Sequence, residues 1–317
     1  MRIYGPVPSR RFGLSLGVDI VPHKVCPLDC IYCQLGETDC LQVEREDFYT
    51  IEEIISDVKE ALEEGPAPDV ITLAGSGEPG LYLHLGELID ELKKLSDAPV
   101  LLITNAVLLT NPDMAAAALK ADILAPSLDA GDVETFERIN KPHPDLNFDD
   151  IVESLVAVTN AHPGEVRLEV MLIRDINDDR ESIEKIAAIT KRVKCDRIDI
   201  NTPVRPPVPE RGALPCNEDT LELAKSILGP KAVPIAKFEK RHRSQKQLHE
   251  FNDVDKNVRE TLMRRPCTLK DICDSHGLDE PTASDIIHRL QAAGLITADH
   301  TDQGTYYRVP GQNPTSL

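Results

Sequence analysis

Between residues 50 and 201 the chain alternates segments of helical spacing with short apolar runs. Apolar residues recur with the period of an amphipathic helix in segments 50–64, 85–95, 112–120, 132–139, 149–161 and 180–192. Runs that suit buried strands lie at 15–21, 69–74, 99–104, 122–128, 165–173 and 197–201. Six strands alternating with helices predict an α/β fold with a parallel sheet and right-handed crossovers. In such a fold the functional loops gather at the carboxyl ends of the strands.

Three cysteines, Cys26, Cys30 and Cys33, lie within the run C-P-L-D-C-I-Y-C on the loop after the first strand. Their C-x3-C-x2-C spacing allows three thiolates to converge on one metal centre. A [4Fe–4S] cube has four irons, so three cysteine ligands leave one iron open to a further ligand. The spacing therefore favours an iron–sulfur centre at which something else binds and reacts.

A structural zinc site is the alternative for this region, because Cys40 follows soon after Cys33 and four cysteines could close a tetrahedral site. The usual zinc pattern pairs two short C-x-x-C halves across a longer gap, which this run does not do. The ligand set therefore favours iron–sulfur over zinc. Cys195 and Cys216 show no ligand spacing. Cys267 and Cys273 lie in apolar, helical contexts and are predicted to be core thiols.

Glycine and polar residues follow the later strands at the predicted functional edge. The candidates for ligand contacts are Gly75, Ser76, Gly77, Glu78, Thr104, Asn105, Ser127, Asp129, Arg174 and Asn201. Glycines let a backbone turn sharply and approach a ligand closely, although many strand–helix turns contain them too. Strand alternation places Ser127 and Asp129 on one side. Glu169, a charge inside an otherwise apolar strand, needs a partner or a cavity.

The cysteine spacing, with Tyr32 directly before the last cysteine, resembles the signature of the radical S-adenosylmethionine (SAM) superfamily. The resemblance implies a partial (β/α)6 barrel in which the open iron chelates the amino and carboxylate groups of SAM. Electron transfer then cleaves SAM to methionine and a 5′-deoxyadenosyl radical. An oxidoreductase of this type implies an electron donor such as ferredoxin or flavodoxin.

The run G-S-G-E-P, residues 75–79, resembles the G-G-E-P element of that superfamily, with Ser76 in place of the first glycine. The element binds the amino group of SAM through its backbone and a neighbouring carboxylate, which makes Gly77 and Glu78 candidates. Tyr32 stands where the aromatic of the superfamily lies near the adenine. Packing of this ring against the barrel rim is equally compatible with its position.

Two further strand ends carry the resemblance. The sequence I-T-N-A resembles a common T-N-G, with Ala106 replacing glycine, and implies that Thr104 and Asn105 bind polar groups of SAM. The sequence P-S-L-D implies a role for Ser127 at the SAM carboxylate or ribose. Asp129 is predicted either to bind the ribose or to cap the following helix.

The segments G-P-V-P-S-R-R and N-T-P-V-R-P-P resemble the branch that contains the tRNA wybutosine-synthesising enzymes, over about residues 1–235. That reaction uses a second cluster, and this chain shows no convincing second set of cysteines and reaches its first strand almost at once. We therefore do not carry the reaction over. Arg174 and Asn201, which end the fifth and sixth strands, complete the candidates for SAM or substrate contacts.

After a basic run at residues 237–246, the residue pattern becomes that of a small helical unit. Helices are predicted at 258–263, 268–276 and 280–293, and a hairpin at 295–298 and 305–309. Three helices and a hairpin are the order of a winged helix-turn-helix. The expected division is a barrel at 1–235, a basic linker at 236–251, a winged-helix domain at 252–310 and a tail at 311–317.

The charge of the last unit bears on its partner. Residues 251–317 hold seven Lys and Arg against ten Asp and Glu, a net charge of −3. Phosphate contacts dominate DNA affinity, so a protein or peptide partner is favoured over DNA, with a purely structural or dimerising role also open. Three functions remain: a radical SAM enzyme acting on an unidentified protein, peptide or RNA substrate, an iron–sulfur regulator that binds DNA, and a zinc-stabilised binding protein. The motifs favour the first.

The composition bears on the binding partners and the cellular compartment that we expect for the chain. Its net charge of −19 disfavours bulk binding to nucleic acid or anionic membranes. The first residues lack the apolar segment of a secretory signal, and no apolar run is long enough to span a membrane. Eight cysteines, three of them clustered, suit metal chemistry in a reducing cytoplasm rather than a disulfide framework.

Overall fold

A computed structural model of the chain describes residues 2–9, 11–203, 211–235, 254–264, 266–301 and 304–310. The linker at 236–251 with its basic run at 237–246, the tail at 311–317 and residues 204–210 of the proline-rich segment after Asn201 lie outside these residues. No helix within the described ranges is both long and apolar enough to cross a membrane.

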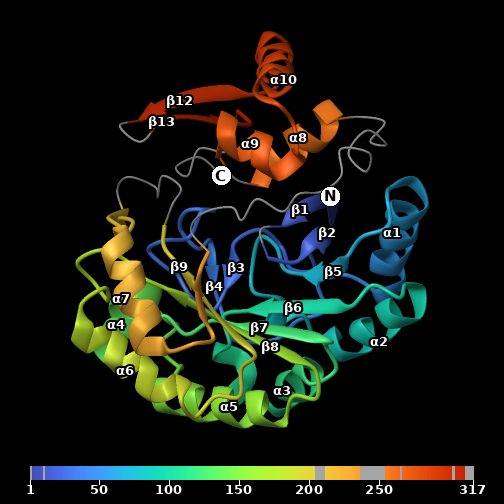
Figure 1. Cartoon of the computed structure of the whole chain (residues 1–317). Helices are drawn as coiled ribbons and strands as arrows, with labels where there is room; N and C mark the ends of the chain where they lie inside the picture. Colours follow the sequence, from blue (N-terminus) through green and yellow to red (C-terminus); the bar gives the residue numbers. More distant parts are fainter. Residues whose placement is uncertain are drawn as a thin grey trace.

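An eight-stranded sheet forms the centre of the larger unit (Figure 1). Its spatial order is β1 (Ile3–Ser9), β2 (Gly13–Val18), β5 (Val70–Leu73), β6 (Val100–Thr104), β7 (Ile123–Pro126), β8 (Glu165–Met171), β9 (Arg197–Asn201) and β10 (Ala232–Pro234). Strands β2 to β10 pair in parallel, and only β1 is antiparallel to its neighbour. All six predicted strands are therefore confirmed, and β1 and β10 extend the sheet at its two edges.

Seven helices surround the outer face of the sheet (Figure 1). They are α1 (Ile51–Glu64), α2 (Leu85–Leu95), α3 (Pro112–Ala118), α4 (Val133–Asn140), α5 (Phe148–Ala161), α6 (Arg180–Thr190) and α7 (Glu218–Leu228). Side-chain caps start six of them, as at Thr50, which forms a capping box with Glu53. The main hydrophobic core lies between these helices and the outward residues of the strands.

Strand β8 shows how the sheet separates its two faces. Val166, Leu168 and Val170 are fully buried in the main core, whereas the residues between them are only partly buried. Because side chains alternate along a strand, Glu169 and Met171 face the inside of the barrel.

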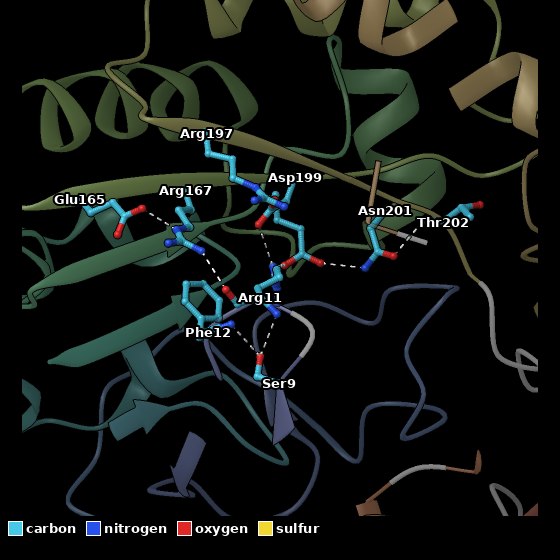
Figure 2. Close-up of polar contacts among 10 residues, drawn as sticks. Ser9, Arg11, Phe12, Glu165, Arg167, Arg197, Asp199, Asn201 and Thr202 are labelled. Atoms are coloured by element: carbon cyan, nitrogen blue, oxygen red, sulfur yellow. Dashed lines mark hydrogen bonds and ion pairs between the residues drawn. The ribbon is translucent and has the colours of Figure 1, made fainter. Parts of the chain in front are cut away.

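The turn between β1 and β2 fills the inside of the barrel near the amino ends of its strands. Phe12 packs with Val70 and Leu101, and the guanidinium of Arg167 lies 4.5 Å from the centre of its ring. Arg11, which precedes Phe12 in the turn, reaches across to strands β8 and β9 (Figure 2). Because this turn fills the amino end of the barrel, a site can form only among the loops at the carboxyl ends of the strands.

The C-terminal unit contains α8 (Val254–Arg264), β11 (Cys267–Thr268), α9 (Leu269–His276), α10 (Glu280–Ala292), β12 (Thr297–Thr301) and β13 (Gly304–Arg308). The three helices and the hairpin follow the predicted order, and Thr268 caps α9 as predicted. The unit has a hydrophobic core of its own, and α8 and α9 contact the edge strand β1 (Figure 1). The helical context predicted for Cys267 is wrong, because this buried thiol lies in β11, which pairs with β13. Cys273 does lie in a helix, α9.

Candidate functional site

Cys26 ends the short strand β3 (Val25–Cys26), and Cys30 and Cys33 lie on the loop that connects β3 to its parallel partner β4 (Cys40–Leu41). Backbone bonds from Cys33 N to Cys30 O (3.0 Å) and from Gly36 N to Cys33 O (3.2 Å) fold the loop tightly. Burial raises the pKa of Cys26 to about 12, and the negative charges of Glu78 and Cys33 add to the effect. Burial and the neighbouring Cys26 likewise raise the pKa of Cys30. The thiols are thus close enough to act on one another electrostatically, and their deprotonation needs a compensating positive charge.

Each of the three sulfurs has an N–H donor of its own. Asn105 Nδ2 lies 3.6 Å from Cys26 Sγ, Asn140 Nδ2 lies 3.3 Å from Cys30 Sγ, and Lys24 Nζ lies 3.6 Å from Cys33 Sγ. Hydrogen bonds to the sulfurs are one of the means by which proteins stabilise iron–sulfur clusters and tune them. The donor set therefore fits a cluster, and Cys26, Cys30 and Cys33 are the residues that would hold it.

A single metal ion fits this region less well than a cluster. No three His, Cys, Asp or Glu side chains in the described ranges are grouped around one point where an ion could bind. In a cube each thiolate binds a different iron, so its ligands need not surround one point. Cys40 is exposed in β4, and its thiol donates to Gln42 Oε1 at 3.1 Å. These features favour iron–sulfur over the four-cysteine zinc alternative.

The glycine run at 75–79 lies directly against the cysteine loop. Lys24 N donates to Ser76 O at 2.6 Å, and Glu78 N donates to Val25 O at 3.1 Å. A Cβ on Gly77 would lie 2.4 Å from the same Val25 oxygen, so only glycine allows this approach. The hydroxyl of Ser76 donates to Asp19 Oδ2 at 2.6 Å. This bond gives a structural reason for serine at the position where the superfamily pattern has glycine.

Glu78 joins the ends of strands β5 and β6. Its carboxylate is buried and accepts from Gly80 N (2.9 Å), Thr104 Oγ1 (2.6 Å) and Asn105 N (2.9 Å). Burial raises its pKa despite these three bonds, which act in the opposite direction. Because Asn105 also donates to Cys26, the predicted residues Glu78, Thr104 and Asn105 form one network beside the cysteine loop.

Ala106, which follows this network, has φ = 69°, in the left-handed region. Left-handed backbone costs a residue with a Cβ about 1–2 kcal/mol, and glycine avoids that cost. The conformation explains why the superfamily pattern has glycine at this position.

Asp129 is the centre of a second network. Its carboxylate accepts from Tyr32 Oη (2.5 Å), Asn140 Nδ2 (3.0 Å) and Met171 N (3.1 Å). Burial raises the pKa of Asp129, and burial together with the Asp129 charge raises that of Tyr32. The helix-cap alternative for Asp129 is wrong, because Asp132 caps α4 by accepting from Thr135 N at 2.8 Å.

A pocket opens beside these networks. It is lined by the predicted residues Asn105, Ser127 and Asp129, and apolar side chains that include Phe136 and Phe148 complete its wall. Asn140 also lines it, and the Oδ1 atom of this buried amide accepts no hydrogen bond from the described residues. The pocket thus brings polar and aromatic side chains together beyond the carboxyl ends of β6 and β7.

Glu169 and Asn201 belong to a third network, on the inner face of β8 and β9. Figure 2 shows Arg11, Asp199 and Asn201 of this network. Arg11 Nη1 lies 2.6 Å from Glu169 Oε2, and Asn201 Nδ2 lies 3.0 Å from Glu169 Oε1. Asp199, with no exposed surface, pairs with Arg197 at 2.5 Å and with Arg11 at 3.6 Å. The expectation that Glu169 needs a partner is confirmed, and its charge reaches both Tyr32 and Asp129.

Among the residues that the structure describes, no side-chain contact joins Arg174 to the cysteine loop or to the other predicted residues. It is exposed beyond the end of β8, its N–H donates to Leu214 O at 3.0 Å, and its charge acts on the Cys216 thiol. Conversely, Lys24, Asn140 and Asp19 contribute to the site but were not predicted. The partners Cys30 of Asn140 and Ser76 of Asp19 are far away in sequence. Only Lys24, two residues before Cys26, offered a signal.

Comparisons with known proteins agree with this geometry. The family model described as "Radical SAM superfamily" matches residues 20–187, more than half of the 317 residues. A crystal structure of a radical SAM methyltransferase from Sphaerobacter thermophilus superposes with a TM-score of 0.50 at 16% identity, over 69% of this chain and 65% of that one. At such low identity the likeness concerns the fold alone.

Relatives in sequence extend the comparison. A Helicobacter pylori UPF0026 protein is 38% identical over 208 residues, 64% of this chain and 67% of that protein. A Methanocaldococcus jannaschii UPF0026 protein is 36% identical over 206 residues, 64% of each chain. A Brachyspira hyodysenteriae protein named "GTPase Obg" is 37% identical over 300 residues. Those residues are 93% of this chain but 43% of that protein, so the chain spans less than half of its length. The chain belongs to the radical SAM superfamily and, within it, to the UPF0026 family.

Proposed function

We propose that this chain cleaves SAM reductively at a [4Fe–4S] cluster held by Cys26, Cys30 and Cys33 and uses the product to modify a substrate inside the barrel. The observation that carries the proposal is the cysteine loop itself, in which each sulfur faces a separate N–H donor. When bound, the cluster and SAM supply a 5′-deoxyadenosyl radical, the chemistry by which members of the superfamily act.

The residues of the chain would bind and orient SAM. The Glu78 carboxylate accepts from three donors on its neighbours, which leaves it one further acceptor position for the SAM amino group. Ser127 and Asn140 line the pocket, where the Ser127 hydroxyl can donate to the SAM carboxylate and Asn140 Oδ1 can accept from a ribose hydroxyl. Tyr32, held by Asp129, stays the predicted neighbour of the adenine.

The substrate would lie against the third network, deeper in the barrel. Arg11 and Glu169 keep 15% and 14% of their side-chain surface exposed, so a ligand above them can reach both. Asn201 adds an amide to the same wall. The likeness to the wybutosine branch rests on sequence segments alone, and the substrate class that it suggests, RNA, is one of several that this polar wall could accept.

The experiment that tests this function is electron paramagnetic resonance of the reconstituted, dithionite-reduced protein with and without SAM. We expect a signal from a reduced [4Fe–4S] cluster whose shape changes when SAM is added, because SAM becomes a ligand of the open iron. A cluster signal that SAM leaves unchanged would contradict the proposed role.

The C-terminal unit is proposed to be a winged helix that docks a protein or peptide partner. Two of its arginines are already occupied: Arg289 pairs with Asp255 at 2.6 Å, and Arg308 pairs with Asp299. These pairs, together with the net charge of −3 over residues 251–317, disfavour binding to a phosphate backbone. Strand β12 lies at the edge of the sheet order β11-β13-β12, where an extended peptide can add as a further strand.

The full-length protein is therefore expected not to shift short DNA duplexes at physiological salt. Gel-shift or fluorescence anisotropy assays over a range of salt concentrations measure this directly. Tight, sequence-specific binding that weakens steeply with salt would instead support a DNA-binding regulator.

The GTPase name of the Brachyspira relative does not carry over to this chain. A P-loop requires a Gly-Lys pair followed by Ser or Thr. The 317-residue sequence contains no Gly-Lys pair.

A further inference from the structure

Lys24 is a buried cation beside the cysteine loop, with only 3% of its surface exposed. A buried ammonium is costly unless an opposite charge or several acceptors compensate it. Its Nζ donates to the carbonyl oxygen of Gly36 at 2.6 Å and lies 3.6 Å from Cys33 Sγ. No carboxylate in the described ranges forms an ion pair with it.

A second cation, Arg211, lies nearby, and unlike Lys24 it forms an ion pair with a carboxylate. Arg211 also donates to Gly36 O, at 2.8 Å, but its guanidinium pairs with the carboxylate of Asp29. The charge of Arg211 is therefore compensated within the protein. The charge of Lys24 instead faces the sulfur of Cys33, at 3.6 Å.

The fold fixes the direction in which Lys24 points. Its N–H donates to Ser76 O at 2.6 Å, and its carbonyl accepts from Asp39 N and Cys40 N, both at 3.1 Å. Its φ of 58° lies in the left-handed region, which a side chain occupies at a cost of about 1–2 kcal/mol. The loop thus holds this lysine in a strained backbone conformation that places its ammonium against Cys33.

We propose that Lys24 is the counter-ion of the iron–sulfur cluster and raises its reduction potential. The inference rests on the proposed function. A one-electron reductant adds one negative charge to a site that already holds three thiolates, and a nearby fixed cation stabilises the reduced form more than the oxidised form. Asn105 and Asn140, the donors at the other two sulfurs, are neutral and contribute only their dipoles.

The test is a redox titration of the reconstituted full-length protein without SAM, followed by electron paramagnetic resonance. Lys24→Met and Lys24→Gln are expected to lower the equilibrium constant for reduction about tenfold, which is about 59 mV for one electron. Lys24→Gln can keep a bond to Gly36 O and so separates hydrogen bonding from charge. Lys24→Arg keeps the charge and should stay near the wild-type potential. Lys141→Met, which removes a half-exposed lysine close to Asp29, is the matched control and should change nothing.

The outcomes are distinct. Neutral variants that hold four irons at an unchanged potential would overturn the proposal. If both neutral variants lose the cluster while Lys24→Arg keeps it, the need for the charge is supported. If Lys24→Arg loses it as well, Lys24 is a structural residue and the proposal is wrong. A wild-type protein that takes up no cluster would instead overturn the proposed function.

Discussion

Cys33→Ala protein, reconstituted anaerobically with iron and sulfide, is expected to lose the broad visible absorbance of an iron–sulfur cluster. The substitution removes one of three thiolates, and the remaining two cannot complete the ligand set of the cube. Iron bound per chain, measured by inductively coupled plasma spectrometry, should fall from about four to below one.

Cys40→Ala is the matched control for that experiment, because it removes a cysteine from the same loop region. The thiol of Cys40 is exposed and bonds to Gln42, so its loss should leave the absorbance and the iron content unchanged. Equal loss of metal in both variants, or stoichiometric zinc without iron, would favour the four-cysteine zinc site.

Gly77→Ala is expected to destabilise the protein and to impair cluster uptake. The new Cβ would lie 2.4 Å from Val25 O, and this backbone cannot move freely because Glu78 N already bonds to the same oxygen at 3.1 Å. Such overpacking typically costs about 1–3 kcal/mol, and Tm falls about 2–4 °C for each kcal/mol in a domain of this size. Differential scanning fluorimetry and iron content measure the two effects.

Gly86→Ala provides the comparison for Gly77→Ala. Gly86 lies in α2, where a Cβ would meet the Ala117 side chain at 3.3 Å, and alanine favours helix by up to about 1 kcal/mol. Its Tm should therefore stay within a few degrees of wild type. If Gly77→Ala behaves like Gly86→Ala and binds iron normally, the close approach of the two loops does not organise the site.

The sheet could be predicted from sequence wherever strands are buried on both faces. Strands such as β5 and β6 are continuous apolar runs with glycine or polar residues at their ends, which is a clear pattern. Strand β1 was missed because I-Y-G-P-V-P-S contains one glycine and two prolines, residues that strands disfavour except at edges. Strand β10 has three residues and ends in proline, too short for a periodic signal.

The site was predictable to the extent that its residues follow strand ends. Glu78, Asn105 and Asp129 could be named because the carboxyl ends of parallel strands share one edge. Their hydrogen-bond partners could not be named, since Asn140 and Cys30 are 110 positions apart and Ser76 and Asp19 are 57 apart. Such pairs depend on how the barrel closes, which the pattern along the chain does not encode.

The role of Asp129 illustrates the same limit. From local spacing, Asp129 suited a helix cap as well as a ligand contact. In the structure Asp132, three residues further on, caps α4. Asp129 instead accepts from Tyr32 on the cysteine loop and from Asn140 at the end of α4. A residue that ties three distant segments together cannot be identified from its immediate neighbours.

Quantification of 5′-deoxyadenosine tests the central claim most directly. The reconstituted full-length protein is incubated anaerobically with SAM and dithionite, and products are separated by liquid chromatography with mass spectrometry. We predict 5′-deoxyadenosine and methionine in equal amounts, formed by wild type and by Cys40→Ala but not by Cys33→Ala. Protein that holds four irons and binds SAM, yet forms no 5′-deoxyadenosine above the Cys33→Ala background, would contradict the account.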